Sequence, residues 1–231
     1  PLFKLMCEGP EEQLILTKNA QPALMANSVA VVRVIEAETQ KKIGDLVDYV
    51  AGHSLGEYSA LAAINSISLN DAAKLLRLRG ESMQAAVPIG DGAMAALLGA
   101  DMDAVTKIIT EASKIGICEI ANDNAPGQIV ISGEAKAVDK AIKMSSEFGV
   151  RKAMSLPVSA PFHCSMMKPA AEVMAAALET TVINSPDIPL VANVSASVGS
   201  GDPSEIRNSL VEQVTSLVRW RETVLWLPKQ N

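Results

Sequence analysis

The sequence predicts an α/β protein with a smaller subdomain inserted into a larger unit, and three observations support this fold class. Apolar residues make up 48% of the 231 residues and charged residues 20%, which is enough for a sizeable core. Aromatic residues are only 3%, so Ala, Met, Leu and Val supply the bulk, and such a core favours helices packed on a sheet. Strand-like and helix-like segments also alternate along the chain.

The segments before residue 88 open the larger unit. The elements expected there are a helix over 22–40, a strand over 46–51, a helix over 55–64 and a helix over 71–86. Pro22 suits a first turn, and the first helix is apolar on more than one face, which indicates a buried helix. Asn70 is expected to cap the last of these helices.

The middle of the chain predicts a subdomain of its own over residues 88–157. The expected elements are strands over 93–98, 117–121, 128–132 and 152–158, and helices over 102–113 and 135–148. Their order, β-α-β-β-α-β, is ferredoxin-like. Asp101 is the expected cap of the first helix, and the segment NDNAPG, residues 122–127, is expected to be a turn.

The larger unit then resumes and takes in residues 1–87 and 158–231. Helices are expected over 165–179, 203–215 and 219–227, and a strand over 189–194. No apolar run approaches the roughly 18 residues of a membrane span, and no signal peptide precedes the first helix. We therefore expect no membrane association.

Charge and cysteine content narrow the partners and the compartment. A net charge of −6 argues against nucleic acid as the main partner, because phosphate binding needs a concentrated basic face. The three cysteines, Cys7, Cys118 and Cys164, form no CxxC pair and indicate a reducing, cytoplasmic setting. Two histidines with no Cys or carboxylate cluster nearby predict no metal site.

The most informative motif is GxSxG at residues 52–56, placed between a predicted strand and a predicted helix. In a nucleophile elbow the glycines let the chain turn sharply and keep the serine hydroxyl, here that of Ser54, clear of its neighbours. The N–H of Leu55 is then placed to stabilise an oxyanion at the start of the helix. The elbow predicts an α/β-hydrolase-like large subdomain. The other interpretation is a Gly-rich turn that merely starts a helix.

A serine nucleophile needs a base, and the chain has two histidines. His53 directly precedes Ser54, and in a sharp elbow its side chain points away from the hydroxyl. His163 follows a predicted strand and precedes a helix, where active-site loops of α/β folds lie, so it is the favoured base. Cys164, beside it, is interpreted as a small buried loop residue.

Four segments carry a resemblance to a known family. They are GHSLGEYSAL (52–61), RLRGESMQAAVPIGDGAMAALLG (77–99), NDNAPGQIVISG (122–133) and LPVSAPFHCSMMKPAA (156–171). In order and spacing they resemble bacterial malonyl-CoA:acyl carrier protein transacylases and polyketide acyltransferase domains, over essentially the whole chain. The resemblance implies transfer of malonyl from coenzyme A to the phosphopantetheine thiol of acyl carrier protein, in fatty acid biosynthesis. It implies a monomer that binds no cofactor, since the coenzyme A thioester is a substrate.

The resemblance also assigns roles to residues. Ser54 matches the family nucleophile and His163 the base, which is oriented by the backbone carbonyl of the residue matching Gln213. Arg79 matches the arginine that binds the malonyl carboxylate, although from sequence alone it is a surface helix charge.

Three more positions match substrate-binding residues of the family. Phe162 resembles the residue of malonyl-selecting variants, where a bulky ring crowds an α-methyl group. Asn122 and Asn124 match a polar cleft lining, and their interpretation as turn residues stays open. Family members also begin with a GQGSQ motif and continue into a GPG-containing turn, and we expect such flanking residues outside the printed sequence.

Two other functions stay open. A serine hydrolase shares GxSxG and takes its acid between serine and histidine in the chain, where Asp123 and Asp139 lie. A non-catalytic scaffold that docks a carrier protein is the second. A carboxylate-binding arginine at position 79 favours the transacylase over the hydrolase, and the presence of both Ser54 and His163 argues against the scaffold.

Overall fold

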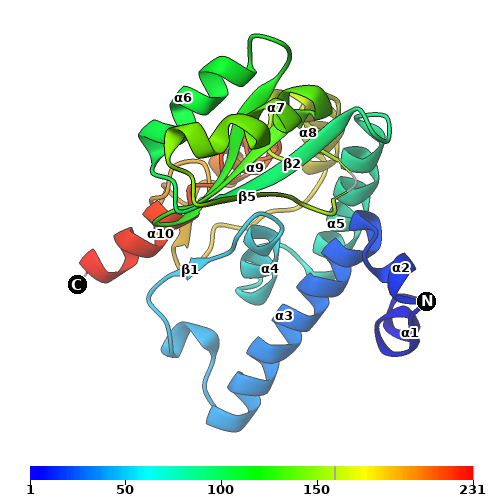
Figure 1. Cartoon of the computed structure of the whole chain (residues 1–231). Coiled ribbons are helices and arrows are strands. Elements are labelled where there is room, and N and C mark those ends of the chain that lie inside the picture. The colour runs from blue at the N-terminus through cyan, green and yellow to red at the C-terminus, as the bar shows by residue number, and fades with distance from the viewer. Residues whose placement is uncertain (159, 231) are drawn as a thin grey trace. The chain divides into compact units, whose positions relative to one another are not determined.

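The computed structural model describes residues 1–158 and 160–230, which form a mixed α/β fold with two separate sheets (Figure 1). The chain divides into two units. The first unit takes in Pro1–Ser82 and Glu172–Val211, and the second takes in Met83–Ala171 and the segment that begins at Glu212. The subdomain boundaries predicted at residues 88 and 157 stay predictions.

The first unit is mainly helical. Its elements are α1 (Leu2–Glu8), α2 (Glu11–Leu14), α3 (Thr17–Thr39), a 3-10 turn (Ile43–Asp45), β1 (Val50–Ala51), α4 (Gly56–Ala63), α5 (Leu69–Ala85), α8 (Lys168–Glu179), β6 (Leu190–Val191) and α9 (Pro203–Glu212). The helices α5, α8 and α9 each run across a boundary between the units. The two short strands pair in parallel, Val50 with Leu190 and Ala51 with Val191.

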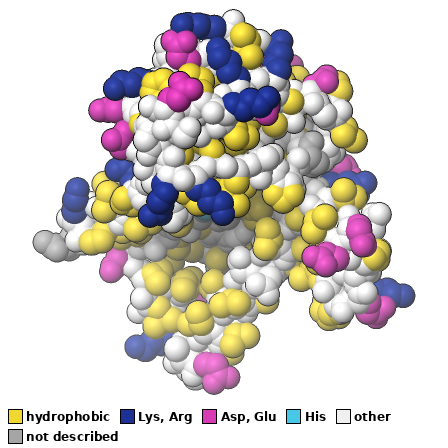
Figure 2. All heavy atoms as spheres, viewed as in Figure 1, with side chains coloured by type: hydrophobic (Ala, Val, Ile, Leu, Met, Phe, Trp, Pro, Cys, Tyr) yellow, Lys and Arg dark blue, Asp and Glu magenta, His cyan; other side chains and the backbone are white. Residues whose placement is uncertain are grey.

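Helix α3 differs from its prediction at the start and in its burial. It begins at Thr17, because the N–H groups of Asn19 and Ala20 already bond the Leu16 carbonyl, so Pro22 lies inside the helix. The expected full burial was wrong, since Leu24, Val31 and Val34 are each more than half exposed. Figure 2 shows hydrophobic side chains gathered over the lower end of α3 and the segment that follows it.

Two further local predictions for this unit were wrong. The strand expected over 46–51 shrinks to β1, since the N–H groups of Leu46 and Val47 donate to the Ile43 carbonyl and only Val50 and Ala51 pair with β6. Asn70 does not cap α5, because the helix already begins at Leu69. Ser68 takes that role: its Oγ accepts the Asp71 N–H at 3.0 Å and donates to the Asp71 carboxylate at 2.7 Å.

The second unit is built on a four-stranded sheet. Its elements are β2 (Gly92–Leu98), α6 (Met102–Ala112), β3 (Cys118–Ala125), β4 (Gln128–Glu134), α7 (Ala135–Met144), two 3-10 turns (Ser145–Phe148 and Ser165–Met167), β5 (Lys152–Ser155), α10 (Trp220–Trp226) and a last 3-10 turn (Leu227–Lys229). The strand order is β3-β4-β2-β5, and every neighbouring pair is antiparallel. The predicted element order β-α-β-β-α-β is confirmed, and so is the cap at Asp101, which accepts the Ala104 N–H at 2.8 Å.

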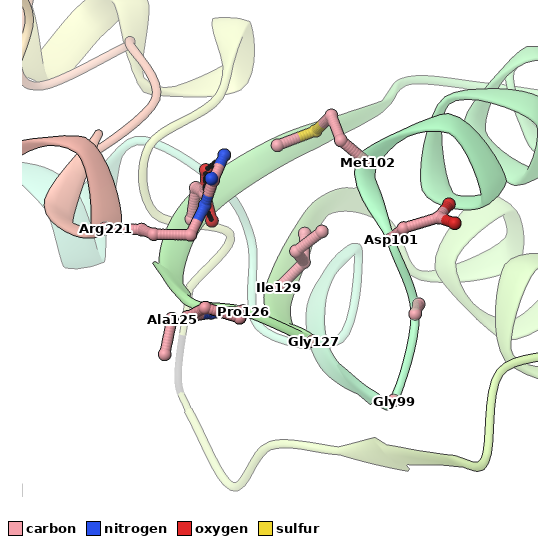
Figure 3. Close-up of a pocket in the computed structure, with 10 residues that line it drawn as sticks. Gly99, Asp101, Met102, Ala125, Pro126, Gly127, Ile129 and Arg221 are labelled. Carbon is pink, nitrogen blue, oxygen red and sulfur yellow. Dashed lines mark hydrogen bonds and ion pairs between the residues drawn. The ribbon is translucent and has the colours of Figure 1, made fainter. Parts of the chain in front are cut away.

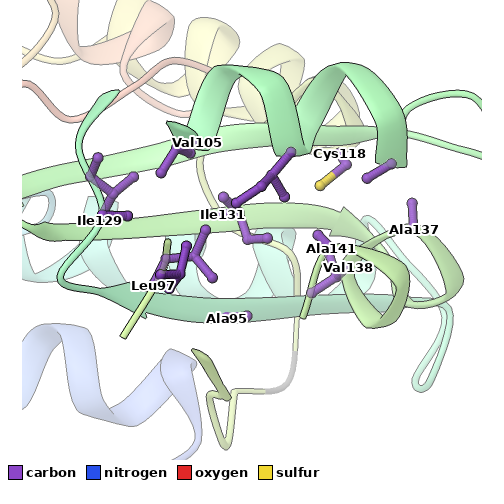
Figure 4. Packing of buried hydrophobic residues seen from close by; sticks show 13 residues of the cluster. Ala95, Leu97, Val105, Cys118, Ile129, Ile131, Ala137, Val138 and Ala141 are labelled. Carbon is purple, nitrogen blue, oxygen red and sulfur yellow. The ribbon is translucent and has the colours of Figure 1, made fainter. Parts of the chain in front are cut away.

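Helices α6 and α7 cover one face of this sheet (Figure 4). Side chains alternate between the faces of a strand, so Ala95 and Leu97 of β2 face the helices while Met94 faces the other way. On the helix side Leu97 belongs, with Val105 of α6 and Val138 of α7, to a cluster that is almost fully buried. Each such branched side chain contributes about 1.5–3 kcal/mol of burial free energy, which makes the sheet a rigid support.

The segment 122–127 is a strand end, and the turn predicted for all of it was wrong. β3 continues to Ala125 through two register shifts against β4, and only Pro126 and Gly127 form the turn. The reason is a second partner: the Val218 N–H donates to Ala121 O at 2.9 Å, and the Asp123 N–H donates to Val218 O at 3.0 Å. This pairing draws the residues of 121–123 into regular structure.

Neither a membrane-spanning helix nor a metal-binding cluster occurs among the described residues. None of the helices there is long and apolar enough to cross a bilayer. Within residues 1–158 and 160–230, no three His, Cys, Asp or Glu side chains are grouped so as to hold a metal ion. The sequence-based expectation of no metal site stays a prediction.

Candidate active site

The GxSxG segment forms a sharp turn between β1 and α4. Ser54 has φ 53°, in the left-handed region that costs a non-glycine residue about 1–3 kcal/mol. The surrounding structure must hold such a conformation, and strained backbone of this kind clusters at functional sites. The prediction of an elbow at Ser54 therefore has a structural counterpart.

Only one of the two glycines of the motif is required by packing. A Cβ on Gly52 would lie 1.9 Å from the carbonyl oxygen of Gly56, far inside any real contact. A Cβ on Gly56 would meet nothing within 4 Å. Both glycines were expected to let the chain turn sharply, whereas the close approach of the backbone depends on Gly52.

Asn193 fixes this turn, although no sequence motif marks it as a site residue. Its Oδ1 accepts the Ser54 N–H at 2.7 Å, and its Nδ2 donates to the Gly52 carbonyl at 2.7 Å. Its own backbone N–H donates to Glu57 Oε2 at 3.2 Å. One fully buried amide thus bonds both sides of the elbow, from the loop that follows β6.

Arg79 lies beside the elbow serine. Its Nη2 donates to Ser54 Oγ at 3.2 Å and its Nη1 donates to Gln21 Oε1 at 2.7 Å. Helices α5 and α3 approach closely at this point, because a Cβ on Gly80 would lie 2.5 Å from Lys18 Cα. The small residue after Arg79 is what lets Gln21 reach the guanidinium.

The guanidinium of Arg79 is buried, contrary to its appearance in the sequence as a surface charge. The residue is 1% exposed, and its Cζ lies 5.9 Å from the centre of the Tyr58 ring. Desolvation lowers the pKa of Arg79, while Tyr58 and Glu57 act in the opposite direction. A buried cation next to a nucleophile favours an anionic ligand at that place.

The helix after the elbow brings N–H groups to the same place. Leu55 has φ −55° and immediately precedes α4, and its carbonyl accepts the N–H groups of Tyr58 and Ser59. No acceptor for the Leu55 N–H is found within the described residues. This amide fits the oxyanion role predicted for it, and the role itself stays a prediction.

His163 lies in the second unit with its ring buried. Its Nδ1 is 2.9 Å from the backbone carbonyl oxygen of Gln213. A carbonyl only accepts, so Nδ1 carries the hydrogen and Nε2 of the neutral ring is left as the basic nitrogen. His163 also has a left-handed φ of 57°. The structure thus brings the predicted histidine and the predicted carbonyl together.

The remaining predicted substrate residues belong to the same unit. Phe162 packs against Met94, Ala121 and Val130 on the sheet face away from α6 and α7. Asn122 is buried within β3, and Asn124 is half-buried two residues further along the strand. Their roles toward a substrate stay predictions.

The other candidate side chains take structural positions. Cys164 is fully buried with its Sγ donating to Pro161 O at 3.1 Å, and desolvation raises the pKa of its thiol. Asp123 forms an ion pair with Arg221, and Asp139 pairs with Lys143 at the surface. His53 lines a pocket of about 440 Å³ in the first unit.

The chain matches the family model described as "Acyl transferase domain" over residues 2–227. It is 46% identical over 224 residues to a malonyl CoA-acyl carrier protein transacylase of Bacillus subtilis, covering 96% of this chain and 69% of that protein.

Solved structures give the same picture. An acyl-carrier-protein-S-malonyltransferase from Bartonella henselae is 53% identical with a TM-score of 0.96, covering 100% of this chain and 73% of that one. A malonyl-transacylase solved in complex with its type II PKS acyl-carrier protein gives 41% identity and a TM-score of 0.94, covering 99% of this chain and 72% of that one. The similarity thus extends over nearly all of the described residues.

Proposed function

This chain belongs to the acyl transferase domain family, and on that premise we propose that it transfers a malonyl group from malonyl-CoA to the phosphopantetheine thiol of acyl carrier protein, in fatty acid biosynthesis. The reaction proceeds through a malonyl-serine. One observation carries the substrate class: the buried guanidinium of Arg79 lies 3.2 Å from the Ser54 hydroxyl. A short acyl group with a free carboxylate suits that pair.

In the proposed mechanism Ser54 is the nucleophile and His163 the general base. The ring nitrogen opposite the Gln213 carbonyl accepts the serine proton, and the serine oxygen attacks the thioester carbon. The Leu55 N–H stabilises the resulting oxyanion. The C–S bond then breaks, and coenzyme A leaves with the proton from the imidazolium. The carrier thiol reverses these steps.

Arg79 selects the substrate. A planar guanidinium binds a carboxylate through two parallel hydrogen bonds, and such bonds are strong where water is excluded. Because Gln21 holds Nη1 at 2.7 Å, the guanidinium is oriented before a substrate arrives. Phe162, Asn122 and Asn124 complete the proposed substrate contacts, with Phe162 favouring malonyl over α-methylated acyl groups.

The finer features of the proposal concern the fold and the setting. We propose an α/β-hydrolase-like large subdomain over 1–87 and 158–231 and a ferredoxin-like small subdomain over 88–157, supported by the strand order β3-β4-β2-β5. The protein acts as a monomer, without a bound cofactor, in the cytoplasm. Its three free cysteines suit a reducing compartment.

A serine hydrolase is the second candidate function, and the printed contacts of its candidate acids in the described part of the chain argue against it. Its acid would have to bond the imidazole, whereas His163 Nδ1 is bonded to a backbone carbonyl. Asp123 is paired with Arg221, and Asp139 is exposed beside Lys143. A scaffold without catalysis requires neither a serine hydroxyl beside a buried guanidinium nor an imidazole oriented by a backbone carbonyl.

The test is incubation with radiolabelled malonyl-CoA, with and without holo acyl carrier protein. We expect label on the protein, no label on Ser54→Ala, and passage of the label to the carrier. Rapid release of malonate without carrier labelling would establish the hydrolase instead. A protein that never takes up label would indicate the scaffold.

A pair of arginine variants tests the substrate class. Arg79→Ala should lower the preference for malonyl-CoA over acetyl-CoA by about 10- to 100-fold, since it removes hydrogen bonds to a charged group. Arg77→Ala is the matched control, because Arg77 lies on the same helix in an exposed pair with Glu81. Equal loss of preference in both variants would contradict the role of Arg79.

A further inference from the structure

An ion pair in the second unit has no part in the mechanism above. Arg221 Nε lies 2.9 Å from each carboxylate oxygen of Asp123, and its Nη2 lies 2.7 Å from Oδ2. The Asp123 side chain is 1% exposed and that of Arg221 32%. The pair lines a pocket of about 470 Å³, in which Arg221 of α10 reaches toward β3 (Figure 3). The guanidinium thus binds the carboxylate through more than one charge-assisted hydrogen bond, and such bonds are stronger than hydrogen bonds between neutral groups.

The pair fixes one segment of the chain to the sheet. Three residues before Arg221, the backbone of Val218 already bonds β3, accepting from the Asp123 N–H and donating to Ala121 O. The ion pair adds a side-chain contact from the first turn of α10 to the same strand. The segment 218–221 is therefore held at two successive points by residues 121–123.

The same segment leads to the carbonyl that bonds the imidazole. Gln213, five residues before Val218, places its carbonyl oxygen 2.9 Å from His163 Nδ1. The chain around Gln213 forms a compact turn, since the Thr215 N–H donates to Glu212 O at 3.2 Å and the Val214 side chain is fully buried. A shift of residues 218–221 on β3 would consequently move the Gln213 carbonyl.

We propose that Asp123 and Arg221 are positioning residues for His163. Their ion pair holds residues 212–221 against β3 and so keeps the Gln213 carbonyl at the imidazole Nδ1. This fixes the ring orientation and the tautomer in which Nε2 is the base. The inference rests on the proposed function only in taking His163 as the base, and it gives Asp123 an effect through the backbone instead of through contact with the histidine.

Histidine NMR tests the geometry without any assay of activity. The chain has two histidines, so ¹⁵N-histidine labelling gives two ring spin systems, and a His163→Gln variant assigns them. We expect the Nδ1–H signal of His163 to shift or broaden in Asp123→Asn and Arg221→Gln, and less in Arg221→Lys, which keeps the charge but not the fork. The His53 signals report whether the first unit of each variant is folded, and urea unfolding followed by circular dichroism reports whether the whole chain is.

Glu111→Gln is the matched control, because it breaks a carboxylate–lysine pair at the surface of the same unit, with Lys114 at 2.7 Å. It should leave the His163 signals unchanged. A His163 signal at its original position in folded Asp123→Asn and Arg221→Gln would overturn the proposal. Arg221 is partly exposed, so its two variants keep the test available if Asp123→Asn does not fold.

Measurement of kcat and KM then distinguishes a positioning role of the ion pair from a purely stabilising one. Displacing a catalytic group by about 1 Å costs up to about 10²-fold, so we expect kcat to fall by about 10- to 100-fold in Arg221→Gln. KM for malonyl-CoA should stay within about twofold, because Arg79 is untouched. A changed KM with unchanged kcat would contradict the proposal. A moved NMR signal in a protein without malonyl transfer would refute the proposed function and leave the positioning role standing.

Discussion

Replacing Asn193 by alanine tests whether one side chain holds the elbow. The change removes the acceptor of the Ser54 N–H and the donor to the Gly52 carbonyl, both at 2.7 Å. A buried acceptor left without a partner costs about 1–3 kcal/mol, and the half-buried amide about 0.5–1.5 kcal/mol. We therefore expect Asn193→Ala to lower the free energy of unfolding by about 2–4 kcal/mol.

The assay is urea unfolding followed by circular dichroism, with serine acylation measured in parallel. Asn208→Ala is the matched control, since Asn208 is exposed on α9 in the same unit and should change stability by less than about 0.5 kcal/mol. Acylation of Ser54 should fall in Asn193→Ala, because the left-handed backbone at Ser54 loses its clamp.

Unchanged stability together with unchanged acylation would contradict the role of Asn193. If Asn193→Ala unfolds within about 0.5 kcal/mol of the unchanged chain and acylates at the same rate, the two hydrogen bonds do not hold the elbow. Loss of stability with normal acylation would show that Asn193 supports the fold while other contacts hold Ser54 in place.

Two other predictions concern glycines and cysteines. Gly52→Ala should abolish acylation and destabilise the fold, because its Cβ would lie 1.9 Å from a carbonyl oxygen, whereas Gly56→Ala should be tolerated in the same thermal melts and labelling assay. In thiol titration at pH 8 we expect exposed Cys7 to react at once, and Cys118 and Cys164 only after denaturation. Burial raises the pKa of Cys118 to about 12, so its thiol stays protonated in the folded state, and the stability linked to it is lost as the pH rises from about 9 toward 12. Fast labelling of all three thiols in native protein would refute the second prediction.

The parts of the fold that were predicted from the sequence are those set by local patterns. Asp101 caps α6 because a cap needs only the next three residues, and the β-α-β-β-α-β order follows from periodicity within each element. The start of α3 was missed for a local reason as well, since Pro22 was taken as a boundary although the first turn forms at Thr17.

The parts of the candidate site that escaped prediction depend on distant residues. Asn193 is 139 residues from the Ser54 amide that it bonds, and an asparagine after a short strand carries no signal of such a contact. The burial of Arg79 follows from the packing of α5 on α3 at Gly80, which no periodicity in either helix reveals. Only the family resemblance pointed to Arg79 and Gln213 beforehand.

The contacts around His163 also set an order of events during synthesis. The strands β2, β3, β4 and β5 lie within residues 92–155, so their sheet can form as soon as these residues leave the ribosome. The Gln213 carbonyl that bonds His163 is made 50 residues after the histidine, and Arg221 is made 98 residues after Asp123. At a synthesis rate of about 5–20 residues per second, Gln213 is added about 3–10 s after His163. The nascent protein thus exposes a nearly complete sheet with an unpaired β3 edge before it acquires an oriented base, and ribosome-bound chains ending before residue 213 should be folded in part and inactive.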